Sequence, residues 1–188
     1  MGKIIASQYL SLDGVMEDPV GMEGSGLGNW TGPFSRGAAG DRFKHEELFG
    51  CEKVLLGRRT YDGFAPVWPT IDDEAGFARR MNAMPKYVVS TTLRTAEWNN
   101  STIIDRDVVA RVAALKDGSS GDIIVYGSAM LLHTLMQAGL VDQYNLMIFP
   151  TVLGQGIRLF PPDWRGALAL TECTEFGGGI VLLRYAAA

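Results

Sequence analysis

Short apolar runs alternate with longer segments of mixed polarity along most of the chain, and turn-forming residues separate them. Such runs are typical of buried strands, whereas the mixed segments have the length and spacing of helices. The pattern predicts strands over residues 3–10, 54–56, 87–90, 102–104, 123–126, 144–149, 168–176 and 180–185. It predicts helices over residues 41–49, 60–64, 73–84, 106–116 and 128–139, the last two capped by Asp105 and Ser128.

Strands and helices alternate through the middle of the chain, and the last two predicted strands flank Gly177-Gly178-Gly179. This order indicates an α/β fold with a mainly parallel sheet, helices on both faces and an antiparallel hairpin at one edge. The length of 188 residues suits one domain, so we expect residues 1–188 to fold together. Ligands of such sheets bind beyond the carboxyl ends of the strands.

Composition excludes several classes of protein. The net charge is −4 and no run of Lys and Arg is present, which argues against nucleic-acid binding. The two cysteines lie far apart, and together with the two histidines they show no spacing typical of metal ligands, so we expect no metal. No apolar segment approaches the ~20 residues of a membrane span, and the chain enters its first strand without a signal peptide. We therefore expect a cytoplasmic protein with no membrane partner.

Four strand ends carry candidate chemistry. Gly57-Arg58-Arg59-Thr60 places two guanidinium groups and a hydroxyl at the start of a predicted helix, which favours a phosphate, although a pair of solvated arginines gives the same pattern. The other three are each also explained by an ordinary turn or cap: Gly127-Ser128-Ala129-Met130, Ser90-Thr91-Thr92 and Ser11-Leu12-Asp13-Gly14.

Residues 17–40 form a long predicted loop that is rich in Gly, Pro and Ser. Loops of this length in compact domains often belong to active sites. Two aromatic residues of the loop, Trp30 and Phe34, are candidates to stack on a planar substrate ring, or they form a small packing cluster of the loop itself. The glycines at 24, 26 and 28 lack the spacing and the strand–helix context of a dinucleotide fingerprint.

Taken together, the segments are more specific than any one of them. The chain resembles the dihydrofolate-reductase-like superfamily, and within it stand-alone proteins similar to the C-terminal reductase domain of the riboflavin-biosynthesis bifunctional deaminase-reductase. The resemblance covers nearly the whole chain and implies the three-layer fold of that superfamily. It is carried by Ser11-Leu12-Asp13-Gly14, Leu56-Gly57-Arg58-Arg59-Thr60-Tyr61, Val125-Tyr126-Gly127-Ser128-Ala129, and residues 138–142 running on to 149–156.

The resemblance implies an NADPH-dependent reductase of a pterin-like or pyrimidine-like heterocycle, often a homodimer. It assigns the phosphates of NADPH to Gly57, Arg58, Arg59 and Thr60, with the two arginines at the 2′-phosphate. The adenosine side falls to Ser90, Thr91 and Thr92, and the pyrophosphate to Gly127, Ser128, Ala129, Met130 and Leu131. The alternative is an NADPH-binding regulator or sensor without reductase turnover.

The chain departs from its relatives in two places. Ser128 stands where the family commonly has a second glycine, often joined to the first by a cis peptide, so the turn is open to a different geometry. The Pro-Cys-x-x-Cys motif of zinc deaminases is missing, which excludes the full bifunctional enzyme.

Reduction of a C=N bond also consumes a proton. Dihydrofolate reductases hold a buried carboxylate on the helix before the Gly-Arg-x-Thr strand, and the resemblance puts Asp41 in that place, where burial would raise its pKa. A helix N-cap is the alternative role for Asp41. Asp13 is the second candidate acid, whereas Glu46 and Glu47 are interpreted as a solvated helix face.

Overall fold

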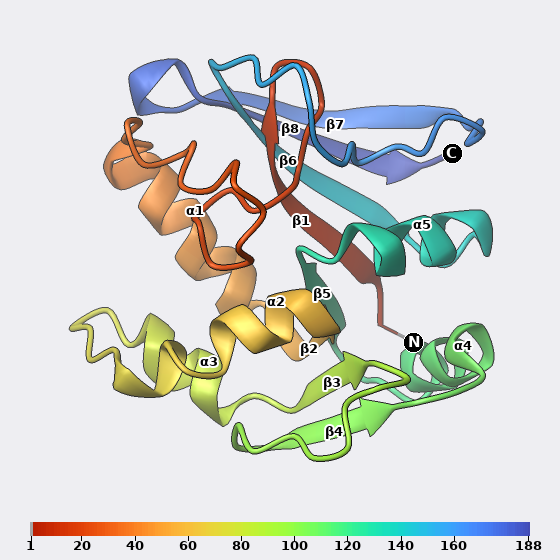
Figure 1. Ribbon diagram of the computed structural model, residues 1–188. Coiled ribbons are helices and arrows are strands. Elements are labelled where there is room, and N and C mark those ends of the chain that lie inside the picture. The colour runs from red at the N-terminus through yellow and green to blue at the C-terminus, as the bar shows by residue number, and fades with distance from the viewer. Residues whose placement is uncertain (1) are drawn as a thin grey trace.

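The computed structural model describes residues 2–188, which form an eight-stranded sheet flanked by helices (Figure 1). The strands are β1 (Ile4–Ser11), β2 (Cys51–Gly57), β3 (Lys86–Val89), β4 (Ser101–Ile104), β5 (Asp122–Tyr126), β6 (Gln143–Phe149), β7 (Leu168–Glu175) and β8 (Val181–Ala187). The helices are α1 (Gly37–Phe49), α2 (Arg58–Phe64), α3 (Phe77–Ala83), α4 (Val108–Asp117) and α5 (Ala129–Gln137). Short 3₁₀ turns lie at Trp68–Thr70 and Gly177–Gly179.

The strand order in the sheet is β4-β3-β2-β5-β1-β6-β8-β7. The first six strands in this order, from β4 across to β6, are parallel to one another. Strand β8 pairs antiparallel with both β6 and β7. The prediction of a mostly parallel sheet with an antiparallel C-terminal hairpin is confirmed. The parallel strands end at one edge of the sheet, where the residues that follow β2, β3 and β5 are brought together.

The two faces of the sheet are covered by different helices. In β5, Ile123 and Val125 pack in one buried cluster with side chains of α4 and α5, whereas Ile124 and Tyr126 pack in another with side chains of α1, α2 and α3. Figure 1 shows these two groups of helices on opposite sides of the sheet. Because neighbouring strand residues point to opposite faces, burial on both sides explains why these strands are continuous apolar runs in the sequence.

Two predicted helix starts and one predicted capping bond are corrected. Helix α1 begins at Gly37, so Asp41 lies inside it and is not its N-cap. Helix α4 begins after Asp107 rather than at Asp105, whose carboxylate pairs with Arg111 instead. Ser128 does stand before α5, but its side chain makes no capping bond because it is engaged across the sheet. No helix within residues 2–188 has the length and apolar character needed to cross a bilayer.

The long segment between β1 and α1 is organised around a buried carboxylate. Asp18 is 1% exposed and accepts hydrogen bonds from the backbone N–H groups of Glu23 and Ser25 and from the Ser25 hydroxyl. Burial raises the pKa of Asp18, but these donors outweigh it and the pKa is lowered overall. The carboxylate therefore fixes residues 18–25 beside the carboxyl end of β1.

Candidate active site

A groove of about 510 Å³ runs along the carboxyl ends of β2, β3 and β5 and the first turn of α5. The parallel registers of these strands place Gly57, Ser90 and Gly127 at neighbouring strand ends. The groove is lined by every predicted cofactor-binding residue except Thr60, namely Gly57, Arg58, Arg59, Ser90, Thr91, Thr92, Gly127, Ser128, Ala129, Met130 and Leu131. We call it the cofactor groove.

The two arginines of the cofactor groove differ in how they are held. Arg58 donates from Nε to Asp62 Oδ2 at 3.1 Å and from Nη1 to the Thr92 hydroxyl. The Arg59 guanidinium is exposed and makes no hydrogen bond or ion pair with another residue in the described part of the chain. One guanidinium is therefore oriented in advance and the other is uncommitted, an arrangement that suits a dianionic phosphate.

The turn between β5 and α5 is built without a cis peptide, since the described residues contain none. Gly127 and Ser128 both have positive φ, at 57° and 63°. The Ser128 hydroxyl accepts from the Gly57 N–H at 2.5 Å and donates to the Thr60 hydroxyl at 3.0 Å. The serine that replaces the family's second glycine thus ties the ends of β2 and β5 together.

The structure does not support the prediction that Thr60 contacts a phosphate of the cofactor. Its side chain is buried, and its hydroxyl is used by Ser128 on one side and by Glu23 Oε1, at 2.9 Å, on the other. A Cβ placed on Gly127 would lie 2.6 Å from the Thr60 hydroxyl oxygen. Thr60 therefore packs under the turn and supports the groove from below, and Gly127 is required there by packing as well as by its φ.

A second hollow, of about 740 Å³, lies on the side of the sheet covered by α1, α2 and α3, and we call it the inner cavity. Its polar base includes Ser7, Gln8, Lys44 and Tyr126. Its walls are largely apolar, with Val20, Met22, Phe34, Phe64, Trp68, Phe77 and Phe149. The inner cavity and the cofactor groove share three lining residues, Met16, Glu23 and Gly127. The two hollows adjoin along these residues, which we call the junction.

A buried ion pair lies at the base of the inner cavity. Lys44 Nζ is 2.5 Å from Glu47 Oε2 and 2.7 Å from the Ser7 hydroxyl, which itself donates to Glu47. Asn145 Nδ2 donates to the other carboxylate oxygen at 2.7 Å. The prediction that Glu47 is solvated is wrong, because its side chain is only 2% exposed. The sequence held one indication of a buried polar partner on α1, because Ser7 in β1 and Asn145 in β6 are polar residues within apolar strands.

Tyr126 covers this ion pair. Lys44 Nζ lies 4.9 Å from the centre of its ring, and its hydroxyl is buried with no hydrogen-bond partner among residues 2–188. Burial, followed by the nearby Glu47 carboxylate, raises the pKa of Tyr126 well above its ordinary value. The group at this point is therefore a neutral phenol at any physiological pH.

Neither predicted acid has the environment that the prediction requires. Asp41 is 67% exposed and paired with Arg36 Nε at 2.7 Å at the rim of the inner cavity, so it is not a buried carboxyl. Asp13 lines neither hollow. It accepts from the Ser11 hydroxyl and from the N–H groups of Leu153 and Gly154, which lower its pKa to about 2. Asp13 is therefore ionised at neutral pH and fastens the turn.

The two aromatic residues of the long loop have different roles. Trp30 is 7% exposed, donates from Nε1 to the Glu17 carbonyl at 2.9 Å and meets Phe149 edge to face, so it belongs to the packing of the loop. Phe34 also packs on Phe149 but lines the inner cavity. The packing interpretation is correct for Trp30, and Phe34 stays a candidate for ring contact.

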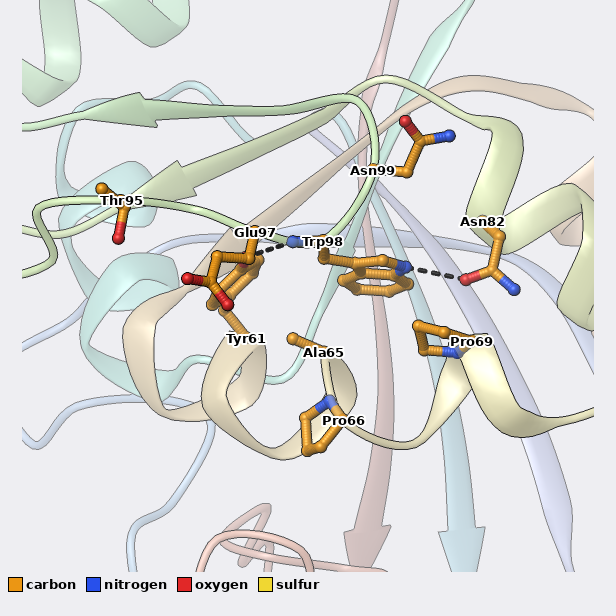
Figure 2. A pocket seen from close by; sticks show the side chains of 9 residues that line it. All are labelled: Tyr61, Ala65, Pro66, Pro69, Asn82, Thr95, Glu97, Trp98 and Asn99. Atoms are coloured by element: carbon orange, nitrogen blue, oxygen red, sulfur yellow. Dashed lines mark hydrogen bonds between the residues drawn. The ribbon is translucent and has the colours of Figure 1, made fainter.

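A third hollow, of about 700 Å³, lies away from the parallel strand ends, between α2, α3 and the β3–β4 connection. Figure 2 shows the Trp98 indole at its centre, donating to Asn82 Oδ1 at 2.7 Å, while the Trp98 backbone N–H donates to the Tyr61 hydroxyl at 3.0 Å. Trp98 is 4% exposed, and these contacts clamp the connection onto the helices. The residues around this hollow hold the structure together, and we assign them no part in the candidate site.

Comparison with known proteins assigns the family. The family model of the RibD C-terminal domain matches residues 2–182, and the chain belongs to that family. It is 31% identical over 138 residues to the protein YyaP of Bacillus subtilis (strain 168), covering 71% of this chain and 73% of YyaP.

Two solved structures place the fold. A protein from Shewanella sp. PV-4 that is named for riboflavin biosynthesis has a TM-score of 0.77 at 17% identity, and the match covers 99% of each chain. Dihydrofolate reductase from Enterococcus faecalis, solved with NADP(H), has a TM-score of 0.57 at 15% identity, covering 99% of this chain and 96% of the other. The predicted dihydrofolate-reductase-like fold is confirmed.

Proposed function

We propose that the protein is an NADPH-dependent reductase of a small planar heterocycle. The observation that carries the proposal is the junction of the cofactor groove with the inner cavity at Met16, Glu23 and Gly127. A dinucleotide lying in the groove would reach the junction with one end, and a ring in the inner cavity would meet it there. Membership of the RibD C-terminal domain family and the dihydrofolate-reductase-like fold support a reductase.

The residues of the groove fit NADPH. When bound, NADPH supplies a hydride to the substrate. Arg58 and Arg59 would hold the 2′-phosphate, and the hydroxyls of residues 90–92 would line the adenosine side. The first turn of α5 offers backbone N–H groups to the pyrophosphate. The uncommitted guanidinium of Arg59 favours NADPH over NADH.

The inner cavity suits a flat, largely apolar ring with a few polar edges. Its aromatic walls can pack on the faces of such a ring, and Phe34 is placed to do so. Its cations are already engaged: Lys44 with Glu47, and Arg36 with Asp41. We therefore infer a pterin-like or pyrimidine-like substrate. From the family resemblance we also infer that the protein is a homodimer and that it acts in the cytoplasm. Light scattering of the purified protein tests the oligomeric state.

A binding and turnover assay tests the proposed function. NADPH is titrated into the protein while its fluorescence is followed, and its oxidation is then measured over a panel of pterins and pyrimidines. Binding followed by oxidation with at least one compound supports the reductase. Binding without oxidation by any compound overturns it in favour of a nucleotide-binding regulator, and absence of binding overturns both.

A further inference from the structure

Glu23 places a carboxylate at the junction of the two hollows, and the proposed function gives this carboxylate no role in binding cofactor or substrate. Of the three residues that line both the cofactor groove and the inner cavity, Glu23 alone is ionisable. Its position is fixed from both sides. Its backbone N–H donates to Asp18 Oδ1 at 2.9 Å, and its Oε1 accepts from the Thr60 hydroxyl at 2.9 Å.

The other carboxylates that line the two hollows are held by strong donors. Asp18 is bound by two N–H groups and a hydroxyl, and Asp73 by the N–H groups of Phe77 and Ala78. Glu17 accepts from the Ile157 N–H at 3.0 Å. Asp41 is paired with Arg36. For Asp18 and Asp73 these donors lower the pKa, so each of these two groups is a poor source of protons.

Glu23 has a different environment. Within the described residues its carboxylate accepts from a single side chain, the neutral hydroxyl of Thr60. The charged groups that face it are Asp18 and Glu17 from the same loop and Arg59 from α2. Burial raises the pKa of Glu23, the two neighbouring carboxylates raise it further, and the balance exceeds the lowering by Thr60 and Arg59. A proton on this carboxyl is therefore favoured relative to an ordinary glutamate.

We propose that Glu23 is the catalytic acid of this reductase, delivering its proton to the substrate at the junction of the two hollows. The proposal rests on the proposed function. In the reaction, the carbon of the substrate C=N bond gains a C–H bond from the hydride of NADPH, and the nitrogen gains an N–H bond from Glu23. The products are the reduced ring and NADP⁺. Water then returns a proton to the carboxylate, which is partly exposed.

Three variants test the role of Glu23. Glu23→Gln keeps the shape and the Thr60 contact but holds no transferable acid proton, so we expect kcat to fall about 10²-fold or more while NADPH affinity stays within about twofold. Glu23→Asp should restore part of the rate. Glu46→Gln makes the same chemical change on an exposed face of α1, outside both hollows, and should leave kcat unchanged.

A readout without turnover completes the test. The side-chain carboxyl carbon of Glu23, assigned by its loss in Glu23→Gln, is followed by ¹³C NMR in the ligand-free protein, and its pKa should lie above the ordinary 4.5. The alkaline limb of the wild-type pH–kcat profile should be missing in Glu23→Gln. A pKa at or below 4.5, or wild-type kcat in Glu23→Gln, overturns the role of Glu23 alone. Absence of turnover in the wild-type protein with every acceptor overturns the reductase and this role together.

Discussion

The cofactor groove and the inner cavity are built in different ways. Most of the groove is made of short segments that directly follow β2, β3 and β5, and Met16, Glu17, Glu23 and Ile157 from two loops complete its wall. The inner cavity is made of the loop of residues 12–36, α1, the segment from α2 to α3 and side chains from the sheet. Parallel topology brings most of the groove together, whereas most of the inner cavity requires contacts between residues that are distant in sequence.

Their electrostatics also differ. The groove presents exposed guanidinium groups, one of them uncommitted, which suits recognition of an anion. At the inner cavity the charges of Lys44 and Arg36 are balanced by carboxylates, which suits a neutral ring recognised by shape. Under the proposed function, one hollow selects its ligand by charge and the other by packing, and the predictions below separate the two.

The largest effect is expected from Glu47→Gln. The change leaves the Lys44 ammonium buried without its counter-charge, which should lower the free energy of unfolding by about 3–5 kcal/mol. Denaturant unfolding measures it. The exposed Glu46→Gln should change the same quantity by less than about 0.5 kcal/mol. The double variant Lys44→Met with Glu47→Leu should recover most of the free energy of unfolding that Glu47→Gln loses. If the double variant is destabilised as much as Glu47→Gln, the effect does not come from the unpaired charge.

The groove is tested by Arg59→Ala and Arg58→Ala. Losing a charge-assisted contact to the 2′-phosphate should weaken NADPH binding by about 1.5–3 kcal/mol, or roughly 10- to 150-fold. NADH binding should change much less. Titration of both cofactors measures the difference, with Arg42→Ala, an exposed arginine of α1, as the matched control. Equal losses for the two cofactors would remove the 2′-phosphate from the explanation.

Gly127→Ala is expected to damage the turn that joins the two hollows. The new Cβ would lie 2.6 Å from the Thr60 hydroxyl oxygen at a residue whose φ is 57°. We expect a loss of about 1–3 kcal/mol in the free energy of unfolding, together with weaker NADPH binding. Unchanged stability in calorimetry would show that the turn adapts.

The smallest effect is expected from Asp13→Asn, at a residue that lines neither hollow. The native pKa of about 2 lies below the ordinary 3.8, so the carboxylate stabilises the fold above pH 3.8 and this contribution is lost as the pH falls toward 2. The Tm of the variant should therefore be lower than that of the wild type at neutral pH, and the two should converge in acid. Turnover should be unaffected. Loss of turnover in Asp13→Asn would indicate that Asp13 takes part in the reaction.

Much of the fold could be predicted from the sequence because it is encoded locally. Apolar runs such as Ile123-Ile124-Val125 mark strands that are buried on both faces, and the three glycines at 177–179 mark the hairpin. The cofactor groove followed from the same pattern, since its residues stand at strand ends. Thr60 was misplaced because only the tertiary structure shows that its hydroxyl is used by Ser128 and Glu23.

The inner cavity could not be predicted in the same way. Lys44 and Glu47 are three residues apart on α1, a spacing as common on solvated helix faces as in buried pairs. Their burial depends on Ser7 and Asn145, which come from distant strands. Glu23 had no local signal at all, because its environment is created by the fold of the loop around Asp18 and its contact with α2.

A crystal structure with bound NADP⁺ tests the account most directly. We predict that the 2′-phosphate lies within hydrogen-bond distance of the Arg59 guanidinium and that the nicotinamide ring lies where Met16, Glu23 and Gly127 join the two hollows. The account would be contradicted by a nicotinamide ring directed away from the inner cavity, or by a groove that stays empty in crystals saturated with the dinucleotide.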